Sequence, residues 1–127
     1  MPPPRRAAAR SRRRADRSLT ARHDPTARHE LPEIDAAALE AARAADRLLA
    51  AARAFGNERW TRYLAQMPDR LRDDSVGELR RLARLGRSAF GPKDSIRDVL
   101  PEDATEPFLL AIDRLLKALA RHELERG

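Results

Sequence analysis

Residues Thr105 to Arg126, which read TEPFLLAIDRLLKALARHELER, decide the fold of this chain. Their large apolar residues recur at the i, i+3, i+4 and i+7 spacing of one helical face: Phe108, Leu109, Ile112, Leu115, Leu116, Leu119 and Leu124. Thr105 can cap the start of this helix, and Pro107 fits its first turn, where a missing N–H costs nothing. About 22 helical residues span roughly 33 Å, so the pattern predicts a long helix against which the rest of the domain packs.

Composition and charge divide the 127 residues into two parts. Residues 1–30 contain only Met1 and Leu19 as large apolar residues, and nine arginines there outweigh three acidic residues, so this part carries the entire net charge of +6. Such a segment buries nothing that would offset the entropy lost on ordering. We therefore predict a disordered Arg/Pro/Ala-rich arm at 1–30 and a neutral all-α domain, a bundle of four or five helices, at 31–127.

Several classes of protein are excluded or disfavoured. The absence of cysteine excludes disulfides, thiolate metal sites and cysteine nucleophiles. No apolar run approaches the roughly 20 residues that span a bilayer, and the N-terminus lacks the apolar core of a secretory signal. We therefore expect a soluble, cytoplasmic protein with no membrane partner. Arginine outnumbers lysine by 24 to 2, which indicates a GC-rich bacterial coding sequence and reduces the weight of arginine content as a functional signal.

Two helices are predicted between Asp35 and Leu71. The first runs from Asp35 to Phe55 and stops at Gly56, and its buried face comprises Leu39, Ala42, Ala45, Leu48 or Leu49, Ala52 and Phe55. Asn57 then caps a helix that carries Trp60 and breaks at Pro68, with a possible resumption through Leu71. Trp60 has two interpretations: an exposed anchor for a partner, because tryptophan is enriched at interaction hot spots, or a core residue, which is the commoner role in a small domain.

A capping box, Ser75 to Glu78, predicts a third helix that ends at Gly86. Its polar side carries a row of arginines at i, i+4 and i+7, namely Arg80, Arg84 and Arg87. Such a row could contact phosphates or an acidic partner. The alternative is a solvated face whose charge is balanced by nearby acids, namely Asp73, Asp74 and Glu78.

Residues 86–95 superficially resemble the phosphate loop G-x-x-x-x-G-K-[ST]. Pro92 removes an N–H that would contact phosphate, Asp94 adds a negative charge after Lys93, and a helix rather than a strand precedes the loop. We instead expect a helix-to-helix loop with Phe90 in the core. Ser95 would cap a short helix that ends at Pro101 and turns three side chains inward: Ile96, Val99 and Leu100.

The sequence contains no convincing catalytic, cofactor-binding or metal-binding constellation. His23 and His29 lie in the arm, and His122 with Glu123 lacks the second histidine of H-E-x-x-H. We therefore predict that the protein is not an enzyme and needs no cofactor.

The chain resembles a small bacterial family of unknown function. That family has a Trp-bearing helix, a second amphipathic helix, a loop of the form G-x-G-S-x-x-D-[LV], and a C-terminal amphipathic helix. Trp60 matches the first feature, and the loop matches at Gly91, Ser95, Asp98 and Val99, although Lys93 and Asp94 replace the glycine expected before Ser95. The resemblance implies a helical fold without an established activity.

The function we predict is a non-enzymatic module that binds another protein through a helical face, for example as an immunity or regulatory factor. The candidate contacts are Trp60, Arg80, Arg84 and Arg87. The alternative is a nucleic-acid-associated protein that binds phosphates through the same arginine row and the arm, with candidate contacts Arg5, Arg6, Arg12, Arg13 and Arg14. No aromatic residue interleaves these arm residues, so that binding would be unspecific and sensitive to salt. A homodimer through the last helix, a transit peptide and a passive or untranslated extension at residues 1–30 remain open.

Overall fold

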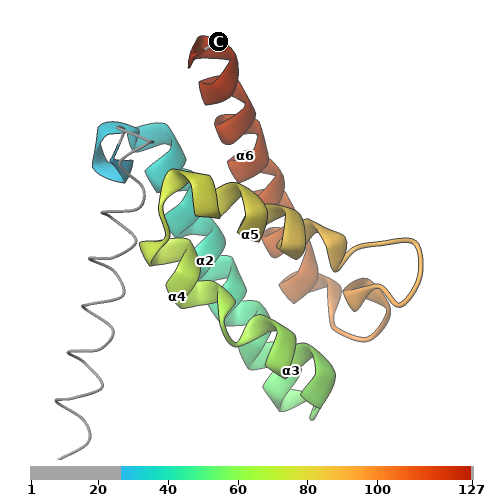
Figure 1. Ribbon diagram of the computed structural model, residues 1–127. Helices are drawn as coiled ribbons and strands as arrows, with labels where there is room; N and C mark the ends of the chain where they lie inside the picture. Colours follow the sequence, from blue (N-terminus) through green and yellow to red (C-terminus); the bar gives the residue numbers. More distant parts are fainter. Residues whose placement is uncertain (1–26, 127) are drawn as a thin grey trace, which may run out of the picture.

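The computed structural model describes residues 27–126 (Figure 1). Within this range the chain is all-α, as predicted, and folds as a small helical bundle. Its elements are the 3-10 turn η2 (Arg28–Glu30), the helices α2 (Pro32–Ala54), α3 (Glu58–Leu64), α4 (Met67–Asp73) and α5 (Val76–Ser88), the 3-10 turn η3 (Ile96–Asp98) and the helix α6 (Glu102–Arg126).

Helices α2 and α6 form one layer, and α5 crosses in front of them, with α3 and α4 on the same side as α5 (Figure 1). Ion pairs from Arg114 to Glu40 and from Arg121 to Glu33 show that α2 and α6 run in opposite directions. The buried face of α2 is rich in alanine, which allows the two backbones to approach closely, and comprises Ile34, Ala38, Ala41, Ala42, Ala44, Ala45, Leu48, Leu49 and Ala52.

Helix α2 begins at Pro32, three residues earlier than predicted. Proline is well suited to the first helical position because its ring fixes φ and the N–H that it lacks would be unpaired there. The helix ends as predicted before Gly56, whose φ of +66° reverses the chain at low steric cost. Phe55 is 61% exposed, so the prediction that it joins the core is wrong.

The caps predicted for α3 and α5 are confirmed, and two breaks are corrected. The Asn57 side chain accepts a hydrogen bond from the N–H of Trp60 at 3.1 Å, and Ser75 Oγ accepts one from the N–H of Glu78 at 3.4 Å. Pro68 lies in the first turn of α4 rather than at a break. Helix α5 continues past Gly86 to Ser88, because Gly86 serves close packing instead of termination: a Cβ there would lie 3.2 Å from carbon atoms of Ile112 and Phe108 on α6.

The loop after α5 packs largely as predicted. The ring of Phe90 stacks on Phe108 with centroids 6.3 Å apart, and Ser95 Oγ accepts a hydrogen bond from the N–H of Arg97. Ile96 and Leu100 are buried, but Val99 is 47% exposed because a short 3-10 turn presents fewer residues inward than an α-helix would. Asp94, where the resemblance expects glycine, has a φ of +54°, the conformation that favours glycine.

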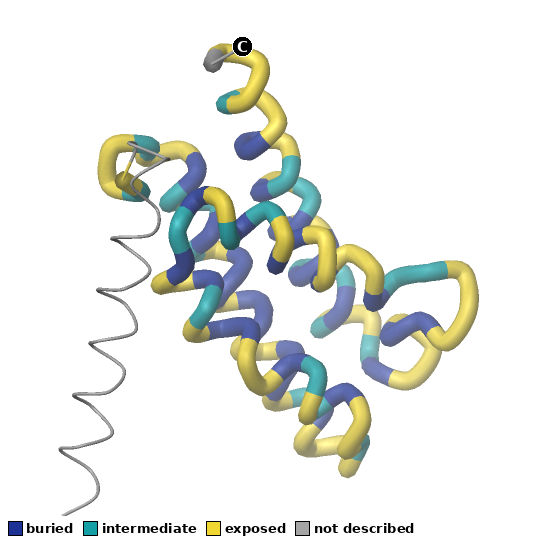
Figure 2. Tube along the Cα trace, in the orientation of Figure 1, coloured by how far each residue is buried: buried dark blue, intermediate teal, exposed yellow. Residues whose placement is uncertain are grey.

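Helix α6 begins at Glu102, directly after Pro101, and not at Thr105. Thr105 is buried inside the first turns, so the prediction that it caps the helix is wrong. Pro107 lies within the helix, where the hydrogen bond that it removes is one near the helix start. Figure 2 shows the inner faces of the helices buried and the last turns of α6 projecting with mostly exposed residues.

The packed part of the chain begins three residues before the predicted boundary at Leu31. Arg28 Nε donates a hydrogen bond to Asp35 at 3.0 Å, and its Nη1 donates one to the backbone carbonyl of Asp74 at 3.0 Å. The Arg28 side chain is only 11% exposed. It therefore joins η2 to the start of α2 and to the end of α4, a role that composition alone did not reveal.

Candidate interaction surface

Helix α5 presents one face to the core and the opposite face to solvent. Its buried residues, Val76, Leu79, Leu82, Ala83 and Gly86, follow helical periodicity and pack toward α4 and α6. The solvent face carries the four arginines of this helix, Arg80, Arg81, Arg84 and Arg87. The tertiary packing of this single helix therefore decides which of its arginines are available to a partner.

The predicted row of three arginines is divided by ion pairs to α6. Arg80 pairs with Glu123, and Arg87 Nε lies 3.1 Å from Asp113 Oδ1. Two of the acids that were expected to balance this row pair with another residue: Arg70 pairs with Asp74 at 3.0 Å and approaches Glu78 at 3.9 Å. Arg80 and Arg87 therefore help to fix α5 on α6.

Arg81 and Arg84 lie between these two tethered residues and are exposed. Neither side chain makes an ion pair or a hydrogen bond to any other residue between 27 and 126. An unpaired guanidinium group offers five N–H donors in a planar arrangement that matches a carboxylate or a phosphate. Of the predicted row, Arg84 is thus the member left available; Arg81, which lies beside the row in the sequence, was not among the predicted contacts.

Trp60 does not belong to this exposed surface. It is 6% exposed and packs in the core, so the hypothesis of an exposed anchor is wrong and the core interpretation is confirmed. Its ring meets that of Tyr63 edge to face, with centroids 5.1 Å apart, and the Arg59 guanidinium lies 5.0 Å from the Trp60 ring centroid. The buried indole therefore packs against the side chains of Arg59 and Tyr63.

Tyr63 joins α3 to the second half of α5. Its hydroxyl donates a hydrogen bond to the carbonyl of Leu85, which also accepts one from Ser88 Oγ at 2.6 Å. The Tyr63 and Ser88 oxygens lie 3.3 Å apart. Burial raises the pKa of Tyr63 above 10.0, and the hydrogen bond with Ser88 partly offsets that rise. This bonding joins the end of α3 to the last turns of α5.

Arg59 and Arg62 are two further exposed arginines, both on α3. With Glu58 and Tyr63 they line a shallow hollow of about 430 Å³ on the outside of α3. Arg62 also lines a neighbouring hollow of about 480 Å³, together with Arg53. These two residues and the α5 residues Arg81 and Arg84 are all exposed and make no ion pair with another described residue, and we call the four of them the arginine surface. Arg59 could have been identified from the sequence, because no acidic residue lies three or four positions from it.

The predicted phosphate contacts of the N-terminal arm lie outside the residues that the structure describes. These contacts are Arg5, Arg6, Arg12, Arg13 and Arg14, all of which precede residue 27.

Between residues 27 and 126 no group of three or more His, Asp or Glu side chains could hold a metal ion. Among the helices that the structure describes, none is both long and apolar enough to cross a membrane.

Comparison of the chain with protein-family models, with curated proteins and with solved structures finds no match. The resemblance through Trp60 and the loop from Gly91 to Val99 therefore stays a prediction.

Proposed function

We propose that this chain is a non-enzymatic protein-interaction module that docks an acidic protein surface through the arginine surface. Such a module would serve, for example, as an immunity or regulatory factor. The observation that carries the proposal is the contrast on α5: Arg80 and Arg87 are paired with α6, whereas Arg81 and Arg84 are exposed without a partner among the described residues.

The physical basis is the different value of arginine pairs in water and at an interface. An exposed ion pair contributes only about 0 to 1 kcal/mol, which is one reason why Arg81 and Arg84 can remain unpaired in the free protein. When a partner covers such a pair and excludes water, losing one member costs about 2 to 5 kcal/mol. Arg59 is held against the Trp60 ring and therefore loses less side-chain entropy on binding.

The experiment is affinity capture from the native host, with the full chain as bait. Wild-type protein is compared with Arg81→Glu/Arg84→Glu, and with Arg43→Glu/Arg47→Glu as a control that makes the same charge change on exposed α2 residues. Each capture is performed with and without nuclease at about 50 mM and about 200 mM salt, a range in which phosphate binding weakens steeply.

The proposal predicts one protein that survives nuclease, is retained by the control variant and is lost with Arg81→Glu/Arg84→Glu. Recovery of nucleic acid that both variants weaken and that salt abolishes would contradict it and would favour the nucleic-acid alternative.

A further inference from the structure

Leu85 is an exposed apolar residue of α5 that lies beside the unpaired arginines. Arg81 lies four residues before Leu85 and Ser88 three residues after it, so these side chains are neighbours on the helix surface. Arg84 lies three residues after Arg81 and four before Ser88, and all four side chains are exposed. We call this group the α5 patch: Arg81, Arg84, Leu85 and Ser88.

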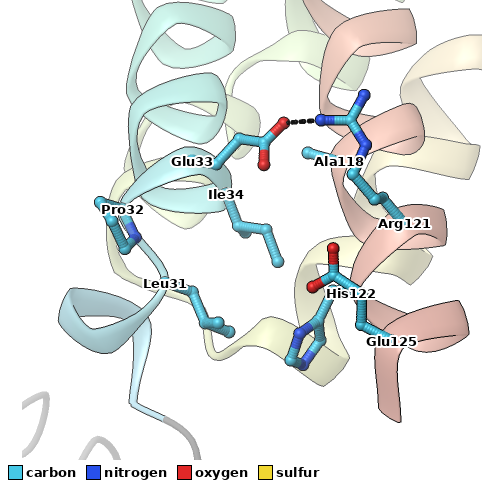
Figure 3. Close-up of a pocket in the computed structure, with 8 residues that line it drawn as sticks. All are labelled: Leu31, Pro32, Glu33, Ile34, Ala118, Arg121, His122 and Glu125. Atoms are coloured by element: carbon cyan, nitrogen blue, oxygen red, sulfur yellow. Dashed lines mark hydrogen bonds and ion pairs between the residues drawn. The ribbon is translucent and has the colours of Figure 1, made fainter. Parts of the chain in front are cut away.

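The surroundings of Leu85 differ from those of the other exposed leucines. Within the described helices there are two others, both on α6: Leu110 and Leu124. The charged residues one turn after the first, Asp113 and Arg114, are both in ion pairs. Arg121, one turn before the second, pairs with Glu33 at the wall of a pocket between α2 and α6 (Figure 3). Leu85 is therefore the exposed helical leucine whose cationic neighbour has no ion pair within the described range.

The backbone of α5 is fixed on both sides of the α5 patch. The carbonyl of Leu85 accepts hydrogen bonds from the Tyr63 hydroxyl and from Ser88 Oγ. The next residue, Gly86, lies directly against the side chains of Phe108 and Ile112 on α6. At 37% exposure, Leu85 is both accessible to a partner and held by its neighbours. A side chain on such a fixed backbone loses less conformational entropy when a partner covers it.

We propose that the α5 patch binds an acidic amphipathic helix of a partner protein, a proposal that rests on the proposed function. Carboxylates of that helix pair with Arg81 and Arg84, and one of its large apolar side chains contacts Leu85. The two unpaired guanidinium groups supply the charge complementarity, because each matches a carboxylate. The apolar contact then lies between charged pairs, as in the apolar centre and polar rim of many protein interfaces.

The spacing within the α5 patch is what favours a helical segment. Arg81 and Leu85 are separated by about 6 Å along the helix axis. A partner helix that lies along α5 presents a glutamate and a leucine at the same separation when they are four residues apart, on one face. The carboxylates belong toward Arg81, because Ser88 is the last residue of α5 and the C-terminal end of a helix repels negative charge.

The test is NMR titration of the isotope-labelled full chain with two synthetic peptides of about 15 residues and identical composition. In the first peptide, leucines occupy one helical face with a glutamate four residues from each, and in the second the same residues are ordered so that the leucines surround the helix. We expect the first peptide to shift the signals of Leu85 and Tyr63 saturably, with a dissociation constant of about 0.1 to 1 mM. The second should bind at least about fivefold more weakly. No saturable shift with the first peptide, or equal binding of the two, would overturn the proposal.

Variants of both molecules test the apolar contact. Leu85→Ala should weaken binding of the first peptide about fivefold or more, because most of the apolar area that the peptide covers is lost. Leu85→Met should restore most of that binding, and Leu124→Ala, the same truncation of an exposed leucine on α6, should leave it unchanged. The NMR spectrum reports whether each variant is folded. Replacing the peptide's leucines with alanine should weaken binding to the wild-type protein similarly, and equal binding of both peptides would contradict the contact.

The arginine variant distinguishes failure of this contact from failure of the proposed function. Loss of peptide binding in Arg81→Glu/Arg84→Glu but not in Leu85→Ala would overturn the role of Leu85 and leave the arginine surface as proposed. Unchanged binding in the arginine variant would overturn both. A short DNA duplex that binds the α5 patch more tightly than the first peptide at the same salt concentration would overturn the choice of a protein helix.

Discussion

Replacing Gly86 with valine should destabilise the domain because side chains of α6 pack directly against this position of α5. A Cβ at Gly86 would lie 3.2 Å from both Ile112 Cδ1 and Phe108 Cζ, inside ordinary van der Waals contact. Valine would add two further methyl groups to that contact. Overpacking of this kind typically costs about 1 to 3 kcal/mol, and the modest gain in helix propensity over glycine offsets only part of it.

Gly77 provides a matched control on the same helix. It is exposed, and a Cβ there would meet no atom within 4 Å. Urea unfolding followed by circular dichroism should find Gly86→Val less stable than Gly77→Val by about 2 kcal/mol, and the melting temperature should fall by roughly 3 to 6 °C for each kcal/mol. Equal stability of the two variants would refute the close approach of α5 and α6 at this position.

Three further predictions concern single side chains. Trp60→Ala should cost about 3 to 5 kcal/mol of stability, whereas Phe55→Ala, a truncation of an exposed aromatic residue, should change the free energy of unfolding by less than about 0.5 kcal/mol; similar costs would contradict the burial of Trp60. Tyr63 is the only tyrosine, so phenolate absorbance should show its pKa above the ordinary value of 10.0, because burial disfavours the ionised form. Its contribution to stability is therefore fully present below about pH 10 and is lost as the pH rises through the higher folded pKa; titration at or below the ordinary value would contradict this. Arg28→Ala should cost about 1 to 3 kcal/mol in urea unfolding, because it leaves a backbone carbonyl and a carboxylate without their donor, and the exposed pair tested by Arg97→Ala should contribute less than about 1 kcal/mol; an equal loss in both variants would argue against the anchoring role of Arg28.

Local signals in the sequence were sufficient for the helices and for two of their caps. Asn57 and Ser75 each bond a backbone N–H three residues ahead, so their geometry depends only on adjacent sequence. Gly86 was misread as a stop because a terminating glycine and a close-packed glycine look the same without the partner helix. Thr105 was misread because a helix start three residues upstream of it, at Glu102, was equally compatible with the apolar pattern.

Which arginines of α5 are paired depends on contacts with residues that are distant in sequence. Arg80 pairs with Glu123 and Arg87 with Asp113, whereas spacing along α5 suggested acids near its own start. Regular spacing therefore predicted a helical face correctly but did not reveal which of its charges were neutralised. Tyr63 likewise gave no signal of its bond to the Leu85 carbonyl, because that bond requires α3 to lie against α5.

The most direct test of the proposed function is to measure the affinity of the captured partner for the full chain by calorimetry. Wild-type protein is compared with Arg81→Glu/Arg84→Glu and with the control Arg43→Glu/Arg47→Glu. If an acidic protein docks on the arginine surface, the first variant loses roughly 30-fold or more in affinity, and the control loses less than about threefold. Equal losses in the two variants would mean that only net charge matters, and the assignment of the arginine surface would be wrong.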